Sequence, residues 1–391
     1  MHPAASVTPD PSGEGAVRSF GILSTFPPTS CGIATFSAAL AAGLIADGSS
    51  VDVVRCGPSP DMEDALVMVS LDDDSPSSRA AAVDVLDATD VVIVQHEYGL
   101  YAGRDGDSIL ALMDAVHAPM VVVAHTVISD PTDHQRSVLE QVCDKADVVV
   151  VMTDTARERL IGGYAVESAK VVVIPHGAAT PAARTGFEPR TRVGAPARLL
   201  TWGLLGPGKG IEWAIDAMAL VDDVRPAPTY VVAGATHPKV RERSGEAYRT
   251  MLMERAARST ADITFDDTYR DLASLTDLIR SADLVVLPYD SRDQVTSGVL
   301  VDAVAAGRPV VSTAFPHAVE LLASGAGIVV PQRDPVALGL AIRAVLTDPD
   351  LAASMAAEAR RLAPELSWSA VAHRYSRLGE RLTAQRQQAA S

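Results

Sequence analysis

Short apolar runs alternate with longer stretches of helical periodicity along most of the chain. The runs at 91–94, 120–124, 147–151 and 284–287 consist almost entirely of Val, Leu, Ile, Met and Ala, without alternating polar positions. Strands of this composition are buried on both faces, which is typical of parallel sheets covered by helices. The alternation of such strands with amphipathic helices predicts an α/β fold.

The alternation is interrupted once, which predicts two domains. Residues 181–197 are rich in Ala, Pro, Arg and Thr without helical or strand periodicity, and we interpret them as a linker. We expect a disordered tail at 1–16, an N-terminal domain at 17–180, a C-terminal domain at 198–365 and a C-terminal helix and tail at 366–391. The expected elements include strands at 17–26, 51–55, 66–70, 91–94, 120–124, 147–151, 170–174, 198–202, 229–233, 262–265, 284–287, 310–311 and 327–330, one charged helix at 238–258 and a last helix from Trp368.

Charge and cysteine content limit the functional classes to which this protein can belong. The formal net charge is −16 and the pI is about 4.9, whereas binding nucleic acid or coating an anionic membrane needs a basic surface. We therefore expect no nucleic-acid partner and at most peripheral membrane contact. No run approaches the roughly 20 apolar residues of a membrane-spanning helix, and the first residues do not resemble a secretory signal. Cys31, Cys56 and Cys143 are far apart in sequence, which fits a reduced, cytoplasmic setting.

A glycine-rich loop with one lysine follows the first strand of the C-terminal domain. Residues 203–210 read GLLGPGKG, which nearly matches the phosphate loop GxxxxGK[ST]. The match fails at Gly210, because a magnesium–nucleotide site needs a hydroxyl at that position. Lys209 at the start of a helix can instead neutralise a diphosphate together with helix N–H groups. We predict an anion site at Gly203, Gly208 and Lys209, and a solvated lysine in a plain turn is the alternative.

The stretch 282–316 forms a second candidate element. An apolar strand ends at Pro288, a polar loop follows, and Ser297 and Gly298 open an apolar helical stretch that ends at Gly307. In a parallel sheet, the helix start after a strand lies at the edge where ligands bind. We predict that the N–H groups of Ser297 and Gly298 face an anion, and Ser297 as a plain N-cap is an equal alternative.

Histidines at strand ends mark a further candidate surface. His96 and His125 each follow an apolar strand and so lie at the carboxyl edge of the expected N-terminal sheet. Many strand-end histidines are structural, and that alternative stays open for both. His176, in the sequence PHG, is either a hinge residue or a simple turn residue. The candidates for the N-terminal binding surface and the hinge are Gly32, Ile33, His96, Glu97, Tyr98 and His176.

Three motifs, read together, resemble the GT-B glycosyltransferases of family 4 (GT4). They are TWGLLGPGKGIEWAIDA at 201–217, LPYDSRDQVTSGVLVDAVAAGRPVV at 287–311 and VIPHG at 173–177. CGIATF at 31–36 and QHEYG at 95–99 resemble one bacterial subset of that family. The resemblance implies two Rossmann-like, doubly wound domains facing across a cleft. The N-terminal domain would bind the acceptor and the C-terminal domain the nucleotide-sugar donor, with the C-terminal helix packing back on the N-terminal domain.

The same resemblance implies roles for individual residues. Lys209 would hold the diphosphate, and His125 would lie near the reacting carbon. The family's E-x7-E pair falls on Gln294, which would contact the donor sugar, and on Asp302, which would hold the ribose. Both positions depart from the family pattern, and Leu204 stands where an arginine is often found. The implied catalytic residues are His125, Lys209 and Gln294, and the implied donor-binding residues are Gly203, Gly208, Lys209, Gln294, Ser297, Gly298, Val299 and Asp302.

The activity implied by the resemblance is that of a retaining hexosyltransferase. It would transfer a sugar from a donor of the GDP-mannose or UDP-hexose type to a glycan, a glycolipid or a small acceptor, without a metal or other cofactor. A GT-B phosphorylase or epimerase is less favoured, because no lysine motif for pyridoxal phosphate is recognisable. The main alternative is a non-catalytic nucleotide-sugar or glycan-binding module with a degenerate E-x7-E motif. Formation of a homo-oligomer stays open.

Overall fold

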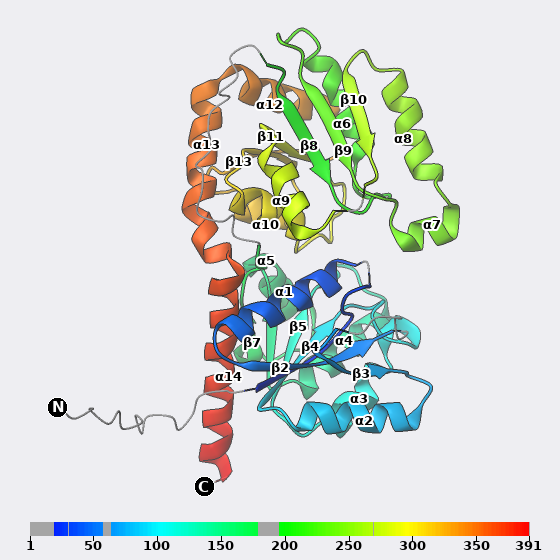
Figure 1. Cartoon of the computed structure of the whole chain (residues 1–391), viewed down its shortest axis with the longest axis vertical. Helices are drawn as coiled ribbons and strands as arrows, with labels where there is room; N and C mark the ends of the chain where they lie inside the picture. The colour runs from blue at the N-terminus through cyan, green and yellow to red at the C-terminus, as the bar shows by residue number, and fades with distance from the viewer. Residues whose placement is uncertain (1–18, 30, 58–63, 179–194, 269, 391) are drawn as a thin grey trace, which may run out of the picture. The chain divides into compact units, whose positions relative to one another are not determined.

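Parallel strands and the helices that connect them make up most of the chain (Figure 1). The computed structural model describes residues 19–29, 31–57, 64–178, 195–268 and 270–390. The predicted tail at 1–16 and residues 181–194 of the predicted linker lie outside these ranges. The α/β prediction is confirmed, because strands and helices alternate in both halves of the described sequence.

The first sheet is parallel, and its seven described strands have the order β3-β2-β1-β4-β5-β6-β7. Phe20 of β1 pairs with Val51 of β2 and with Val91 of β4, so β1 is an inner strand. The strands are β1 (Ser19–Ser24), β2 (Ser50–Cys56), β3 (Val67–Leu71), β4 (Val91–His96), β5 (Met120–Ala124), β6 (Val148–Val151) and β7 (Val171–Val173). The helices are α1 (Gly32–Ala46), α2 (Pro76–Asp87), η1 (Arg104–Gly106), α3 (Ile109–Ala115), α4 (Asp133–Lys145), α5 (Asp154–Gly163) and η2 (Ser168–Lys170).

The second sheet is also parallel, and its six described strands have the order β10-β9-β8-β11-β12-β13. The strands are β8 (Arg198–Trp202), β9 (Thr229–Ala233), β10 (Asp262–Asp266), β11 (Leu284–Leu287), β12 (Val310–Thr313) and β13 (Gly327–Val330). The helices are α6 (Ile211–Ala217), η3 (Met218–Leu220), α7 (Pro238–Ser244), α8 (Ala247–Ala257), α9 (Leu272–Arg280), α10 (Gly298–Ala305), α11 (Pro316–Leu321), α12 (Pro335–Thr347), α13 (Pro349–Leu362), η4 (Ala363–Leu366) and α14 (Trp368–Ala390).

Each sheet has a point at which its strand order reverses. The first sheet grows outward from β1 to β3 and resumes with β4 on the other side of β1, and the second does the same between β8 and β11. Loops leaving two such neighbouring strands diverge and leave room for a ligand at the carboxyl edge. The loop at 203–210 follows β8 and the loop at 288–297 follows β11, so the two predicted anion elements share the switch point of the second sheet.

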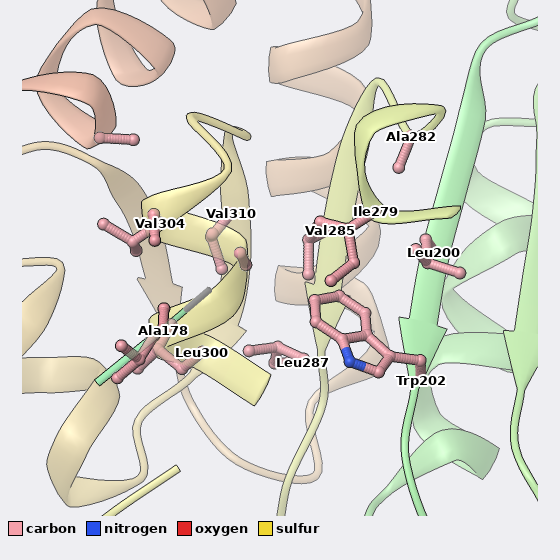
Figure 2. Packing of buried hydrophobic residues seen from close by; sticks show 14 of the residues in the cluster. Ala178, Leu200, Trp202, Ile279, Ala282, Val285, Leu287, Leu300, Val304 and Val310 are labelled. Atoms are coloured by element: carbon pink, nitrogen blue, oxygen red, sulfur yellow. The ribbon is translucent and has the colours of Figure 1, made fainter. Parts of the chain in front are cut away.

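The second sheet is buried on both faces. On one face Leu200 and Val285 pack with residues of α9, α10 and α13, a cluster that Figure 2 shows. On the other face Leu199, which precedes Leu200, and Val286, which follows Val285, pack with residues of α6, α8 and α12. Successive strand residues point to opposite faces, so only an uninterrupted apolar run can bury both. This burial fixes β8 and β11, and therefore the starts of the two loops at the switch point.

Side-chain caps set where several helices begin. Ser75, Thr153, Asp271 and Ser297 each accept a hydrogen bond from the N–H three residues ahead. Such caps satisfy N–H groups that the first turn of a helix leaves open. After the end of α10, Gly307 adopts a φ of +66°, a backbone conformation that glycine reaches without strain.

The structure corrects the predicted helices in three places. The single helix predicted at 238–258 is wrong, because Gly245 adopts a φ of +59° and separates α7 from α8. The helices α5 and α11 were not predicted. The last helix, α14, contains 23 residues, whereas the apolar pattern after Trp368 predicts a helix of about 15 residues.

Internal contacts divide the chain into two compact units. The first contains the described residues up to Val123, the segment His134–Val149 and the chain from Ala372 onward, and the second contains Ala124–Asp133 and Val150–Val371. Most of α14 thus belongs to the first unit, as the predicted packing of the C-terminal helix requires. The boundaries at 17–180 and 198–365 stay predictions. In the first unit, the α14 residue Arg386 donates to the carbonyl of His117 and pairs with Asp147.

Candidate functional site

The loop after β8 packs closely against the end of β11. The Asp290 N–H donates to the Gly208 carbonyl at 3.1 Å. A Cβ atom at Gly210 would lie 1.9 Å from the carbonyl oxygen of Pro288, and Gly210 has a φ of +62°. No side chain fits there without a shift of the backbone. Position 210 therefore cannot hold the Ser or Thr of the phosphate-loop pattern, because the close packing of this loop admits only glycine there.

Lys209 lies in this loop with its ammonium group over an aromatic ring. Its Nζ is 4.2 Å from the centroid of the Tyr289 ring, and Tyr289 stacks on Phe315 with centroids 5.0 Å apart. A ring face attracts a cation without neutralising its charge. Within the described residues Lys209 makes no ion pair, and the neighbouring Asp290 pairs through Oδ2 with Nε of Arg333 at 3.1 Å. The charge and the N–H donors of Lys209 are thus available to an anion.

The first turn of α10 offers two further N–H donors. Ser297 is its N-cap, because the Ser297 hydroxyl accepts from the Leu300 N–H at 3.3 Å. The Ser297 N–H donates to Nδ1 of His317 at 2.8 Å. The N–H groups of Gly298 and Val299 have no partner among the described residues. The Ser297 hydroxyl therefore acts as the N-cap of α10, and the Ser297 N–H is used by His317. An anion at this helix start would meet the N–H groups of Gly298 and Val299.

His317 is a residue of this site that sequence reasoning missed. Its side chain is buried, and burial, with a smaller effect of nearby His176, lowers the pKa of His317 to about 3. The ring is therefore neutral, and because Nδ1 accepts from Ser297, Nε2 carries the proton. The His317 N–H also donates to the Gln294 carbonyl at 3.3 Å. The only sequence signal was Pro316, which starts α11 and places His317 in its first turn.

Gln294 and Asp302 occupy the two positions of the predicted sugar-binding and ribose-binding pair. The Nε2 of Gln294 donates to the carbonyl of Thr296, so this side chain is partly used to hold its own loop. The amide oxygen of Gln294 stays available as an acceptor. Asp302 lies on α10 and is partly accessible, yet burial of its carboxyl raises the pKa to about 7. Burial thus favours the neutral form of this carboxyl up to a higher pH than for an ordinary aspartate.

Nucleotide binding should depend on pH through Asp302 if its carboxylate holds the ribose. Ribose hydroxyls donate more strongly to the ionised carboxylate, so bound nucleotide favours loss of the proton. We expect the affinity for a nucleoside diphosphate to rise with pH, by up to about tenfold per unit below the pKa, and to level off above it. Isothermal calorimetry between pH 5.5 and 8.5 measures this, and Asp302→Asn should flatten the curve. A wild-type curve as flat as that of the variant would remove Asp302 from the site.

His176, predicted as a hinge or turn residue, packs against the start of α10. A Cβ atom at Gly298 would lie 2.9 Å from both Cε1 and Nε2 of His176, so glycine is needed for this contact. The ring lies 5.6 Å from the Trp368 ring, and Nδ1 is 2.6 Å from the Gly177 carbonyl. Burial lowers the pKa of His176 to about 4, which keeps the ring neutral. The structure thus brings His176 together with the predicted donor residues.

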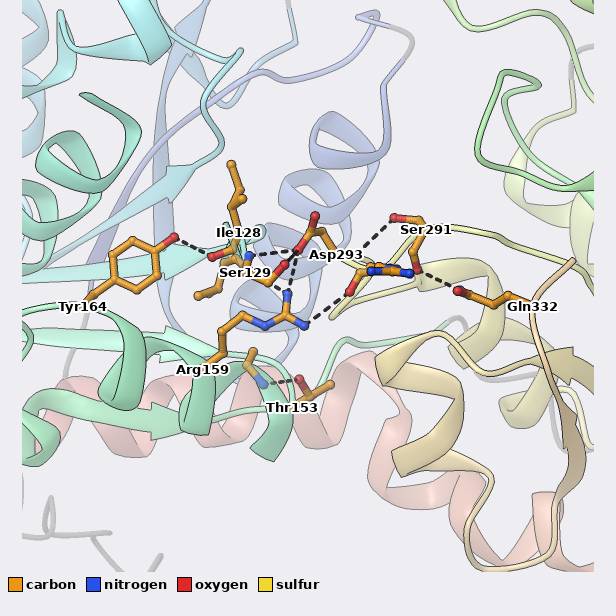
Figure 3. Close-up of polar contacts among 11 residues, drawn as sticks. Ile128, Ser129, Thr153, Arg159, Tyr164, Ser291, Asp293 and Gln332 are labelled. Atoms are coloured by element: carbon orange, nitrogen blue, oxygen red, sulfur yellow. Dashed lines mark hydrogen bonds and ion pairs between the residues drawn. The ribbon is translucent and has the colours of Figure 1, made fainter. Parts of the chain in front are cut away.

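His125 belongs to the second unit, although it follows a strand of the first sheet. It comes directly after β5 and is partly buried. The loop that it begins contacts the loop before α10, since the N–H and the hydroxyl of Ser129 both donate to Asp293 (Figure 3). Asp293 directly precedes Gln294. Two loops that carry candidate catalytic residues are therefore joined within one unit.

The remaining candidates lie at the switch point of the first sheet, in the first unit. Gly32 and Ile33 begin α1, and the space beside Gly32 is open. His96 is 1% exposed, burial lowers its pKa to about 4, and neither ring nitrogen has a partner among the described residues. Tyr98 meets its ring edge-on at 5.3 Å. Glu97 accepts from the Tyr98 N–H at 3.2 Å, so it holds its own turn.

Neither a metal cluster nor a membrane span is found in the described ranges. No three side chains of His, Cys, Asp or Glu there form a group that could hold a metal ion. Of the helices described, none combines the length and the apolar composition needed to cross a bilayer. The described loops of the second switch point carry two side-chain cations without a carboxylate partner, the ammonium of Lys209 over the Tyr289 ring and the guanidinium of the exposed Arg292.

Several known proteins are similar to this chain in sequence or in fold. A D-inositol 3-phosphate glycosyltransferase of Kineococcus radiotolerans is 30% identical over 258 residues, which are 60% of this chain and 57% of that relative, so less than two thirds of its length is matched. Sucrose-phosphate synthase from Thermosynechococcus elongatus has a TM-score of 0.74 at 18% identity, over 94% of this chain and 100% of that one. Anabaena HepE in complex with UDP-glucose has a TM-score of 0.67 at 16% identity, over 92% and 98%.

Two family models match successive parts of the sequence. The model described as Glycosyltransferase Family 4 matches residues 31–180, and the model described as Glycosyl transferases group 1 matches residues 196–348. The first match covers strands of the first sheet and the second match covers the second sheet, in agreement with two Rossmann-like domains. The chain belongs to the GT-B glycosyltransferases of the family 4 type.

Proposed function

We propose that this protein is a retaining hexosyltransferase that uses a nucleoside-diphosphate sugar of the GDP-mannose or UDP-hexose type. The observation that carries the proposal is the unneutralised ammonium of Lys209 at the switch point of the second sheet. The loop that carries Lys209 lies against the start of α10, since a Cβ atom at Gly203 would lie 3.5 Å from Cγ2 of Val299. The first turn of α10 presents the N–H groups of Gly298 and Val299. A diphosphate carries the charge and the acceptor oxygens that such a set of donors binds.

The same donors would assist departure of the nucleoside diphosphate. When the bond from the sugar to the diphosphate breaks, negative charge grows on the phosphate oxygens and positive charge on the sugar ring. Fixed N–H dipoles and Lys209 stabilise the growing negative charge without reorganising. A divalent metal is not required for that purpose, so we propose metal-independent transfer. His125 and Gln294 would contact the donor sugar through a ring nitrogen and an amide oxygen.

The names of the similar proteins support this class of substrate. HepE was solved with UDP-glucose, and the Kineococcus relative is named for a small phosphorylated polyol. We propose accordingly that the acceptor is a hydroxyl of a small polyol, a glycan or a glycolipid. His96, with two buried ring nitrogens and no partner in the described chain, would be the acceptor-side group.

A non-catalytic nucleotide-sugar-binding module is the second candidate. Two features favour it: the amide of Gln294 is engaged with its own loop, and burial raises the pKa of Asp302, which favours its neutral form. Either feature would weaken the binding of the sugar or of the ribose, whereas the groups proposed to bind the diphosphate would be unaffected. The two candidates therefore predict the same ligand and differ in turnover.

A panel of nucleotide sugars tests both candidates. A bound donor at 100 times its Kd should stabilise the fold by about 2.7 kcal/mol, which raises Tm measurably. We expect one UDP- or GDP-sugar to stabilise the protein and then to be transferred or slowly hydrolysed, at an unchanged rate in excess EDTA. Stabilisation without turnover would favour the binding module, abolition of turnover by EDTA would contradict the metal-independent mechanism, and no stabilisation by any donor would refute the proposal.

A further inference from the structure

Two loops of the second unit are held together by one carboxylate oxygen (Figure 3). Oδ1 of Asp293 accepts from the N–H of Ser129 at 2.9 Å, from the hydroxyl of Ser129 at 2.7 Å and from Nη1 of Arg159 at 3.0 Å. Hydrogen bonds to an ionised oxygen are among the strongest in proteins. Asp293 directly precedes Gln294, and Ser129 lies four residues after His125.

Arg159 extends this contact to the backbone of both loops. It lies on α5, and its side chain is only 18% exposed. Nη1 donates to the Val127 carbonyl at 2.9 Å as well as to Asp293, and Nη2 donates to the Arg292 carbonyl at 3.3 Å. The guanidinium is planar and rigid, so it fixes its acceptors in one arrangement.

Two hydroxyl groups from the same region add further contacts to these loops. The Tyr164 hydroxyl donates to the Ile128 carbonyl at 2.7 Å, and the Thr153 hydroxyl donates to the Val295 carbonyl at 3.1 Å. Loops have few apolar contacts of their own, so contacts of this kind decide whether they hold one conformation. Asp293 is the member of this network that joins one loop directly to the other.

We propose that Asp293 is a positioning residue for sugar transfer, which holds the loop of His125 in a fixed place relative to Gln294. The inference rests on the proposed function, because it takes these two residues as the groups that contact the donor sugar. Asp293 acts through Ser129 and Arg159 and needs no contact with substrate. Misplacement of a catalytic group by about 1 Å can cost about 100-fold in rate, so a contact between loops can control turnover.

The chain supplies a matched control in Glu320. This residue of α11 accepts from the N–H groups of Asp154 and Thr155 at 2.8 and 2.9 Å and from the Thr155 hydroxyl at 2.7 Å. Glu320 thus receives three hydrogen bonds, as Asp293 does, in the same unit. Its partners are at the start of α5 and not on the loop of His125. A purely structural role for both carboxylates predicts equal effects on activity, whereas the proposal predicts unequal ones.

The test compares Asp293→Asn with Glu320→Gln in the full chain. We expect the kcat for the donor identified by the panel to fall about 10- to 100-fold in D293N and to change by less than about twofold in E320Q. Binding of UDP or GDP should change by no more than about twofold in either variant, because the diphosphate donors are elsewhere. Equal losses of kcat, or an unchanged kcat in D293N, would overturn the proposal.

Hydrogen–deuterium exchange tests the same contact without any activity. In D293N, exchange of the amides at 125–130 should become about tenfold faster, whereas in E320Q the faster exchange should be confined to the start of α5. An inactive wild-type protein would refute the proposed function, yet the exchange experiment would still decide whether Asp293 holds the loop. Unchanged exchange at 125–130 in D293N would overturn the inference by itself.

Discussion

Replacing Lys209 by methionine is expected to weaken binding of UDP or GDP by about 1.5–3 kcal/mol, the range for hydrogen bonds to charged groups. Kd should therefore rise by about 10- to 150-fold. Methionine keeps a long apolar side chain against Tyr289 and removes only the ammonium. The loss should appear for the nucleoside diphosphate and be absent for the corresponding nucleoside, because Lys209 is placed to meet the phosphates.

Titration calorimetry measures this effect, and Lys239→Met is the control. Lys239 is an exposed lysine at the start of α7 in the same unit, so its replacement changes the net charge equally. Its effect on Kd should be small, as for a surface charge screened by salt. A Lys209→Met protein that bound the diphosphate as tightly as wild type would show that the ammonium over the Tyr289 ring has no part in nucleotide binding.

Gly210→Ala is expected to produce the largest loss of stability. The substitution places a side chain at a φ of +62° and a Cβ atom 1.9 Å from the Pro288 carbonyl oxygen. The left-handed conformation and the forced displacement of the loop should together lower the free energy of unfolding by about 2–4 kcal/mol. Urea unfolding followed by circular dichroism measures the change.

Gly162→Ala is the matched control for this substitution. Gly162 lies in α5, its backbone φ is not positive, and a Cβ atom there would meet nothing within 4 Å. Alanine should be neutral or stabilise the fold by up to about 1 kcal/mol. If Gly210→Ala unfolded at the urea concentration of wild type, the close packing of the loop at 203–210 on the end of β11 would be contradicted.

The sheets and the places of the two loops at the second switch point were predictable because they depend on local sequence. Uninterrupted runs such as 284–287 indicate burial on both faces, and the glycines around Lys209 indicate a tight turn between a strand and a helix. That this turn binds an anion stays a prediction. The family resemblance added the positions of Gln294 and Asp302. The roles of individual site residues, and the domain boundaries, stay predictions.

Contacts between segments distant in sequence were not predictable. Tyr289 under Lys209, His317 on the Ser297 N–H, and Asp293 with Arg159 each join residues 20 to 134 positions apart. Nothing in the local pattern around Tyr289 or Asp293 indicates its partner. The break at Gly245 was missed for a related reason, since helical periodicity continues on both sides of it and only the backbone conformation shows the end of α7.

The ring beneath Lys209 has a consequence for the end of the catalytic cycle. Under the proposed function, an ammonium that Tyr289 holds without neutralising attracts the diphosphate of the donor and that of the product alike. A free nucleoside diphosphate carries more negative charge than the same nucleotide esterified to a sugar, so it gains more from that charge. Released nucleotide would therefore compete with fresh donor for the site, and product inhibition would increase with the concentration of nucleoside diphosphate in solution.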